Sequence, residues 1–179
     1  MTDGLRPVIN SVDLGPNTEV HTFTAPAPSP ASINDAQDIM ASFGAAWQSF
    51  KESGEPNGRW DGVLVACFSV HPLVGQLEAL FPSVAVTGIF EASVLTAVSL
   101  ARQSRDEHWG IVTTGKFWEE HLSSGVAEYL GGSDYLGKLS TFAGVESTGL
   151  NASDFHHGVD PAVVTQRIRE ATGRLLERG

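Results

Sequence analysis

A cysteine and a nearby serine, Cys67 and Ser69, are the residues whose types and spacing point most directly to chemistry. Cys67 ends a short apolar run, residues 62–68, that shows no polar alternation, as is typical of a central parallel strand covered on both faces. Pro72 and the apolar positions after it have helical spacing, and proline suits the first turn of a helix. We therefore expect the thiol at the carboxyl end of a strand, facing the amino end of a helix, where open α/β sheets bind ligands.

This position gives Cys67 two alternative roles. Unpaired backbone N–H groups and the positive end of a helix dipole would favour the thiolate, which makes Cys67 a candidate nucleophile or proton-transferring base. A lone cysteine in an apolar run can equally be a small buried hydrophobe. Ser69 is not expected to belong to a Ser-His-Asp triad, because no G-x-S-x-G elbow surrounds it.

Three further strand ends carry polar groups that could converge with Cys67. Glu91 places a carboxylate at a helix amino terminus, where it orients a ligand or simply caps the helix. Thr113 and Thr114 precede a glycine and a lysine, a combination that suits an anion or a carbonyl oxygen but also an ordinary cap. The polar segment 144–151 follows a predicted strand and is expected to line the same cleft.

Two common kinds of site are not expected. His156 and His157 are neighbours whose side chains point apart on a regular element, and they lack cysteines or carboxylates at ligand spacing, so the sequence predicts no metal site. The glycine-rich patterns of nucleotide-binding loops are absent from the sequence, so phosphate binding of that kind has no support.

The elements that must position these residues alternate along the chain. Strands are predicted over residues 62–68, 84–89, 109–113 and 141–147, and helices over about 73–81, 90–103, 116–130 and 163–178, the last capped by Asp160 and Pro161. Before them the sequence predicts a helix over 3–12, a strand over 18–23, an extended loop over 25–30 and a helix from caps at 32–34 to about 52. Residues 53–59 and 131–138 are expected to be surface connections. The fold class is therefore α/β, built from parallel βα units.

Length, charge and cysteine content limit the number of domains, the classes of partner and the cellular compartment that we expect. With 179 residues, the chain is expected to form a single domain over residues 1–179. A net charge of −10 argues against a nucleic-acid or acidic-membrane partner. The ligand-binding crevice expected at the strand ends suits a small-molecule substrate. One cysteine cannot form an internal disulfide, and neither a bilayer-spanning stretch nor a signal peptide is visible, so a cytoplasmic location is expected.

Four ordered motifs carry a resemblance to a known family. The segments VACFSVHPLV, VTGIFEAS, GIVTTGKFWEEHL and FAGVESTGLNAS resemble, in order and spacing, the hydantoin racemase branch of the Asp/Glu racemase superfamily. The resemblance implies two similar α/β subdomains facing each other across an active site. It also implies a cofactor-independent enzyme in which two cysteines exchange the proton on a carbon next to a carbonyl group. The substrate would be an amino-acid derivative such as a hydantoin- or ureide-like ring.

The resemblance also implies roles for particular residues and leaves two family features unmatched. The first family cysteine matches Cys67, and Ser69, Thr113 and Thr114 match positions that would line the polar groups of the substrate. The family's first strand, ending in Asn-Pro-Asn, and its second cysteine, in a Leu-Gly-Cys motif, have no counterpart here. We therefore expect an incomplete domain with impaired two-base chemistry. Its bared apolar sheet edges could lead to homo-oligomers.

Two alternatives to a racemase remain at this stage. One is a non-catalytic α/β module that binds a small molecule in half of an ancestral cleft. The other is a related decarboxylase or isomerase that needs only one cysteine.

Overall fold

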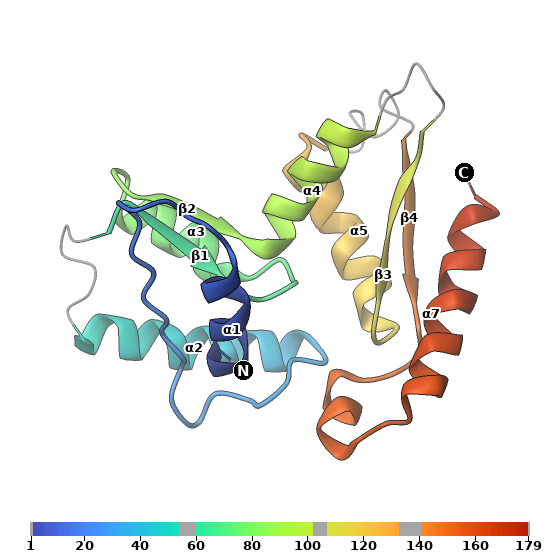
Figure 1. Ribbon diagram of the computed structural model, residues 1–179, viewed down its shortest axis with the longest axis horizontal. Helices are drawn as coiled ribbons and strands as arrows, with labels where there is room; N and C mark the ends of the chain where they lie inside the picture. The colour runs from blue at the N-terminus through green and yellow to red at the C-terminus, as the bar shows by residue number, and fades with distance from the viewer. Residues whose placement is uncertain (1, 54–59, 102–106, 133–140, 179) are drawn as a thin grey trace.

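The computed structural model describes residues 2–53, 60–101, 107–132 and 141–178, and shows an α/β protein with two parallel sheets (Figure 1). One sheet pairs β1 (Gly62–Val65) with β2 (Ala85–Gly88), and the other pairs β3 (Trp109–Thr113) with β4 (Phe142–Ser147). The sheets lie in separate lobes, and α4 (Ile89–Leu100) leads from one lobe to the other. The predicted fold class of parallel βα units is confirmed.

The remaining helices surround these sheets. They are α1 (Thr2–Ser11), α2 (Ala36–Ser53), α3 (Pro72–Leu80), α5 (Phe117–Tyr129), the 3₁₀ helix η2 (Ala152–His157) and α7 (Pro161–Leu176). In the second lobe, α5 and α7 lie on opposite sides of β3 and β4, so this half has three layers (Figure 1).

Helix ends follow the expected chemistry at two places. α3 begins with a proline at its first turn, and the ring of His71 accepts a hydrogen bond from Leu73 N at 3.2 Å. α7 begins in the same way, with Asp160 accepting from Ala162 N at 2.8 Å. In both cases a side-chain acceptor satisfies one of the free N–H groups of the first turn, so the helix start is fixed by local sequence.

The core connects the two lobes. A cluster of buried apolar side chains joins α2, α4, α5, β3 and β4, and its most deeply buried members are Leu122 and Val126, both 0% exposed. A smaller cluster beneath the first sheet contains Val65, Val74 and Leu77. Val70, in the connection after β1, packs against this large cluster. The cluster therefore holds that connection close to the second lobe.

The structure corrects two predicted strands. Residues 18–23 form no strand; instead His21 contacts the ring of Trp60 at 4.6 Å, and Phe23 contacts that of Phe50 at 6.3 Å, so side-chain packing replaces a ladder of backbone hydrogen bonds. β1 is not covered on both faces, because Leu64 is 58% exposed. A short apolar run does not reveal how many layers will cover it.

Smaller differences concern element ends. α2 starts at Ala36 rather than at residues 32–34, because Asp35 accepts a hydrogen bond from Asp38 N at 2.9 Å and so acts as its cap. α4 ends at Leu100 instead of near residue 103. Most of the connections predicted over 53–59 and 131–138 lie outside the described residues.

Candidate functional site

Cys67 and Ser69 lie in the connection between β1 and α3. Cys67 N donates a hydrogen bond to Val65 O at 2.9 Å, which turns the chain directly after the strand. The Cys67 Sγ and Ser69 Oγ atoms are 3.1 Å apart, within hydrogen-bonding distance, and Ser69 is 1% exposed. The thiol is itself half-buried, so it is a partly accessible group with a fixed hydroxyl beside it.

Of the two alternatives for Cys67, its burial favours the partly buried thiol over an activated thiolate in the free protein. Burial raises the pKa of Cys67 above its ordinary value of 9.0, the hydrogen bond from Ser69 opposes this rise, and the charge of Glu91 adds to it. α3 begins only at Pro72, and a helix dipole acts mainly within the first turn, so its help is small beside the cost of burial. Near neutral pH, Cys67 is a thiol.

Glu91 follows the neighbouring strand at the same edge of the first sheet. Val65 pairs with Gly88 in the β1–β2 ladder, so the residues after these two positions leave the sheet side by side. Glu91 lies in the first turn of α4, for which Gly88 is the cap. Burial raises the pKa of Glu91, and hydrogen bonding with the backbone of Glu91 and Gly88 opposes the rise. Apart from these backbone groups, its buried Oε2 atom has no hydrogen-bond partner among the described residues.

Thr113 is the last residue of β3 and Thr114 follows it, and the backbone of both supports the polar segment after β4. Thr113 O accepts from Thr148 N at 2.8 Å, and Thr114 O accepts from Gly149 N at 3.0 Å. The Thr148 hydroxyl also donates to Thr114 O, at 3.2 Å. The two predicted groups of polar residues therefore meet at the carboxyl ends of β3 and β4.

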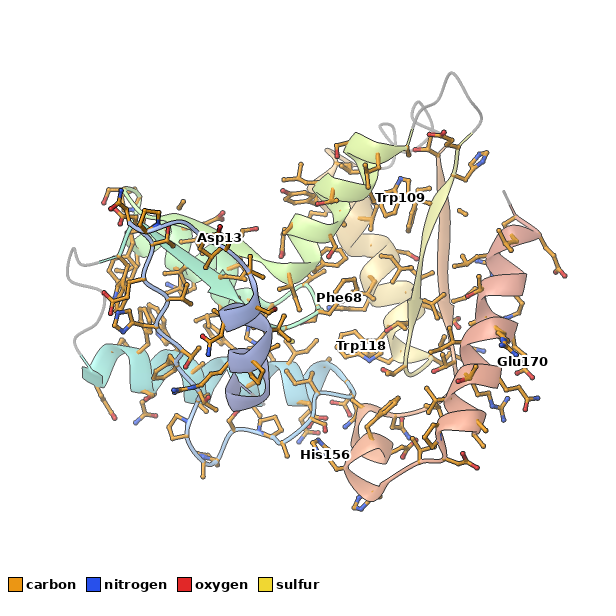
Figure 2. The ribbon with its side chains drawn as sticks, viewed as in Figure 1. Asp13, Phe68, Trp109, Trp118, His156 and Glu170 are labelled. Carbon is orange, nitrogen blue, oxygen red and sulfur yellow. The ribbon has the colours of Figure 1, made fainter. Side chains whose placement is uncertain are left out.

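Packed side chains connect the segment that carries Cys67 to α4 and α5 of the second lobe. The ring of Phe68 meets that of Phe90 edge-on at 5.9 Å, and Phe90 belongs to the same core cluster as Trp118 of α5. Figure 2 shows Phe68 and Trp118 in the region between the two sheets. Val70 packs against Gly125 of α5, where even a Cβ atom would overlap it. The structure thus brings Cys67, Ser69 and Glu91 together and packs the connection that carries Cys67 against α5, whereas Thr113 and Thr114 lie at the end of the other sheet.

Two histidines near Cys67 lie within the quoted motifs but are not among the predicted site residues. His71 is 4% exposed, and its Nε2 lies 3.4 Å from Ser42 Oγ. Because its Nδ1 accepts from Leu73 N, the neutral ring carries its proton on Nε2, and burial lowers the pKa of His71. The His-Pro pair at a helix start is the signal that could have indicated this cap.

His121 is the second of these histidines. Its ring stacks on Phe117 at 5.2 Å, and burial lowers its pKa while a hydrogen bond with the backbone of Val70 raises it. Its Nε2 atom is buried without a hydrogen-bond partner among the described residues. His121 therefore packs directly against the connection that carries Cys67.

Two residues of the polar segment 144–151 do not line the predicted cleft but contact the helices beside β4. Glu146 is 4% exposed, pairs with Arg174 of α7 at 2.5 Å and also with Arg178. Ser147 donates from its hydroxyl to Glu119 of α5 at 2.6 Å, and this bond is the main reason that the pKa of Glu119 is lowered. Glu146 and Ser147 thus tie β4 to the helices on its two sides.

Two further findings concern metals and membranes. Within the described ranges, no cluster of three or more His, Cys, Asp or Glu side chains could hold a metal ion. None of the helices described here combines the length and the apolar character needed to cross a bilayer.

Comparison with known proteins identifies the family. A family model described as Asp/Glu/Hydantoin racemase matches residues 1–179, and the chain therefore belongs to this family. It is 35% identical over 150 residues to an uncharacterized protein of Schizosaccharomyces pombe, a match that covers 84% of this chain. It is 26% identical over 164 residues, 87% of this chain, to the protein DCG1 of Saccharomyces cerevisiae.

Both relatives are longer than the part that this chain matches. The chain spans 56% of the length of the first relative and 64% of the second. No solved structure matches the chain significantly.

Proposed function

We propose that this chain carries half of the active site of a racemase that inverts a carbon next to a carbonyl group in an amino-acid derivative with a hydantoin- or ureide-like ring. Membership in the Asp/Glu/Hydantoin racemase family supports a racemase-like function. The single observation that carries the proposal is the position of Cys67, partly accessible at a strand end and hydrogen-bonded to the buried Ser69.

The proposed chemistry is a proton exchange that needs no cofactor. Inverting a stereocentre requires one group to remove a proton from one face and another to return a proton to the opposite face. Cys67 would be one of these groups. The second group, a cysteine in the family, would come from outside this sequence, in which Cys67 is the only cysteine.

Two groups of polar side chains, one beside Cys67 and one at the carboxyl ends of β3 and β4, would suit a ring that presents both N–H and C=O groups. The unpartnered Oε2 of Glu91 would accept a hydrogen bond from a ring N–H. Ser69, Thr113 and Thr114 would donate to the oxygen on which negative charge develops, a role in which preorganised donors typically contribute a large part of catalysis.

A non-catalytic binding module is the alternative, and one observation favours it. The raised pKa of Cys67 leaves little thiolate near neutral pH, as expected of an inert, partly buried thiol. The two functions differ in a single measurable property, because only the racemase exchanges a carbon-bound proton with solvent.

Deuterium exchange tests the proposal. Each enantiomer of 5-methylhydantoin is incubated with the chain in D₂O, and loss of the C5 proton is followed by NMR against a buffer blank. We expect exchange above the blank, and a loss of about 10²- to 10⁴-fold in Cys67→Ser. Exchange with retention is expected if Cys67 is the one base that this sequence supplies, and exchange with inversion would show that a second acid/base group lies within it. A rate no greater than that of the buffer blank would overturn the assignment of Cys67 as a base.

A matched control separates loss of chemistry from loss of fold. Ser83 is an exposed residue in the turn before β2, and Ser83→Ala should leave the exchange rate unchanged. Tight binding of the hydantoin without exchange in the unmodified chain would favour the binding module.

A further inference from the structure

Ser147, the last residue of β4, is held by side chains from two helices. Its backbone N–H and its hydroxyl both donate to Glu119 Oε1 of α5, at 3.1 and 2.6 Å. Its carbonyl oxygen accepts from Arg174 of α7 at 2.8 Å. Because Ser147 is only 8% exposed, water cannot easily replace these partners. The end of β4 is therefore fixed to both helices by hydrogen bonds to their side chains.

The residues directly after β4 hold the turn that follows β3. Thr148 N donates to Thr113 O at 2.8 Å. Both Gly149 N and the Thr148 hydroxyl donate to Thr114 O, at 3.0 and 3.2 Å. Glu119 lies beyond this turn, in the first turn of α5. The turn between β3 and α5 is thus tied at both of its ends to the end of β4, which closes a ring of hydrogen bonds.

We propose that Glu119 is a positioning residue that acts through Ser147 and fixes the turn after β3. The inference rests on the proposed function, in which the Thr113 and Thr114 hydroxyls donate to the oxygen on which charge develops. Donors that are already in place need no rearrangement as that charge develops, and a displacement of about 1 Å can slow a reaction about 10²-fold. Glu119 therefore acts on the rate without contacting the substrate.

Three variants separate the hydrogen-bond acceptor from the charge. Glu119→Gln removes the charge and keeps an oxygen acceptor. Glu119→Met has a similar length but no strong acceptor, so it leaves the N–H and the hydroxyl of the buried Ser147 without their partner. Glu120→Met is the matched control, because Glu120 is an exposed carboxylate in the same turn of α5. Its interaction with the helix dipole is lost in the same way.

Amide hydrogen exchange, followed by NMR, tests the hold on the turn without a substrate. The amides of Thr148 and Gly149 should exchange about three- to tenfold faster in Glu119→Met than in the unmodified chain, as expected when a hydrogen bond that supports them is lost. They should match the unmodified chain in Glu119→Gln and in Glu120→Met. Unchanged exchange in Glu119→Met would overturn the inference. An equal change at Val145, earlier in β4, would also overturn it, because it would indicate general destabilisation.

The rate of C5 proton exchange tests the link to the reaction. Glu119→Met should lower kcat by about 10- to 10²-fold and change KM much less, because the placement of donors matters most in the transition state. Glu119→Gln should recover most of the lost kcat. Equal kcat values in Glu119→Met and Glu120→Met would overturn the positioning role alone. Absence of C5 exchange in the unmodified chain would overturn the proposed function, so the two failures are distinguishable.

Discussion

Gly125 is the position at which a single methyl group should disturb the connection that carries Cys67. A Cβ atom added there would overlap Val70 Cγ2 and stand 3.2 Å from Phe90 Cζ. Valine is stiff about χ1, so its methyl group cannot easily turn away. Overpacking of a well-packed contact typically costs about 1–3 kcal/mol, whereas replacing glycine with alanine inside a helix gains about 1 kcal/mol. Gly125→Ala should therefore lower the free energy of unfolding by about 0–2 kcal/mol.

Gly44→Ala is the matched control for this prediction. Gly44 lies inside α2, and a Cβ atom there has no neighbour within 4 Å, so the substitution should stabilise the protein by up to about 1 kcal/mol. The helix-propensity gain is common to both variants and cancels in their difference. Urea unfolding should then place Gly125→Ala about 1–3 kcal/mol below Gly44→Ala.

A double variant tests the cause. Val70→Ala removes the overlapping methyl group, so the double variant Val70→Ala with Gly125→Ala should be more stable than the sum of the two single effects by roughly 0.5–3 kcal/mol. Equal stabilisation by Gly125→Ala and Gly44→Ala would refute the reasoning, because it would mean that α5 and the Cys67 connection do not touch at this point.

Three further predictions concern buried polar groups. Because the folded-state pKa of His71 lies below its unfolded value near 6.5, the free energy of unfolding should fall as the pH drops below about 6.5. His71→Asn should flatten this dependence in acid-titrated urea unfolding. Ser69→Ala removes the hydrogen bond that lowers the pKa of Cys67, so the pH profile of Cys67 alkylation should move to higher pH; a shift to lower pH would contradict the assigned role. Arg174→Met should destabilise the protein more than Glu146→Gln in thermal unfolding, because it leaves a buried carboxylate with one partner fewer; the reverse order would show that the pair is not buried as described.

The order of elements could be predicted because local signals mark most of their ends. Pro72 and Asp160 start helices through chemistry that lies within a few residues of sequence, and the apolar runs of β1 to β4 are long enough to be recognised. The segment 18–23 shows the limit. Its β-branched and aromatic residues favour a strand. A strand forms only where its backbone can hydrogen-bond to a neighbouring strand, and here Phe23 packs on Phe50 of α2 instead.

The residues of the candidate site can be proposed from the sequence, but their electrostatics cannot. Cys67 and Ser69 are recognisable because they follow a strand and precede a helix, and Glu91 because it lies in the first helical turn after a strand. The direction of the Cys67 pKa depends on how deeply the thiol is buried and on Glu91, which is distant in sequence. The same holds for Glu146, whose partner Arg174 comes from α7 and not from the local segment.

The measurement that tests the central claim most directly is the rate of C5 proton exchange in D₂O, compared between the unmodified chain and Cys67→Ser. If Cys67 transfers a proton to and from carbon, the unmodified chain exchanges faster than buffer and Cys67→Ser loses about 10²- to 10⁴-fold of that rate. Equal rates in the two proteins, or a rate in the unmodified chain no greater than that of buffer, would contradict the assignment of Cys67 as an acid/base group.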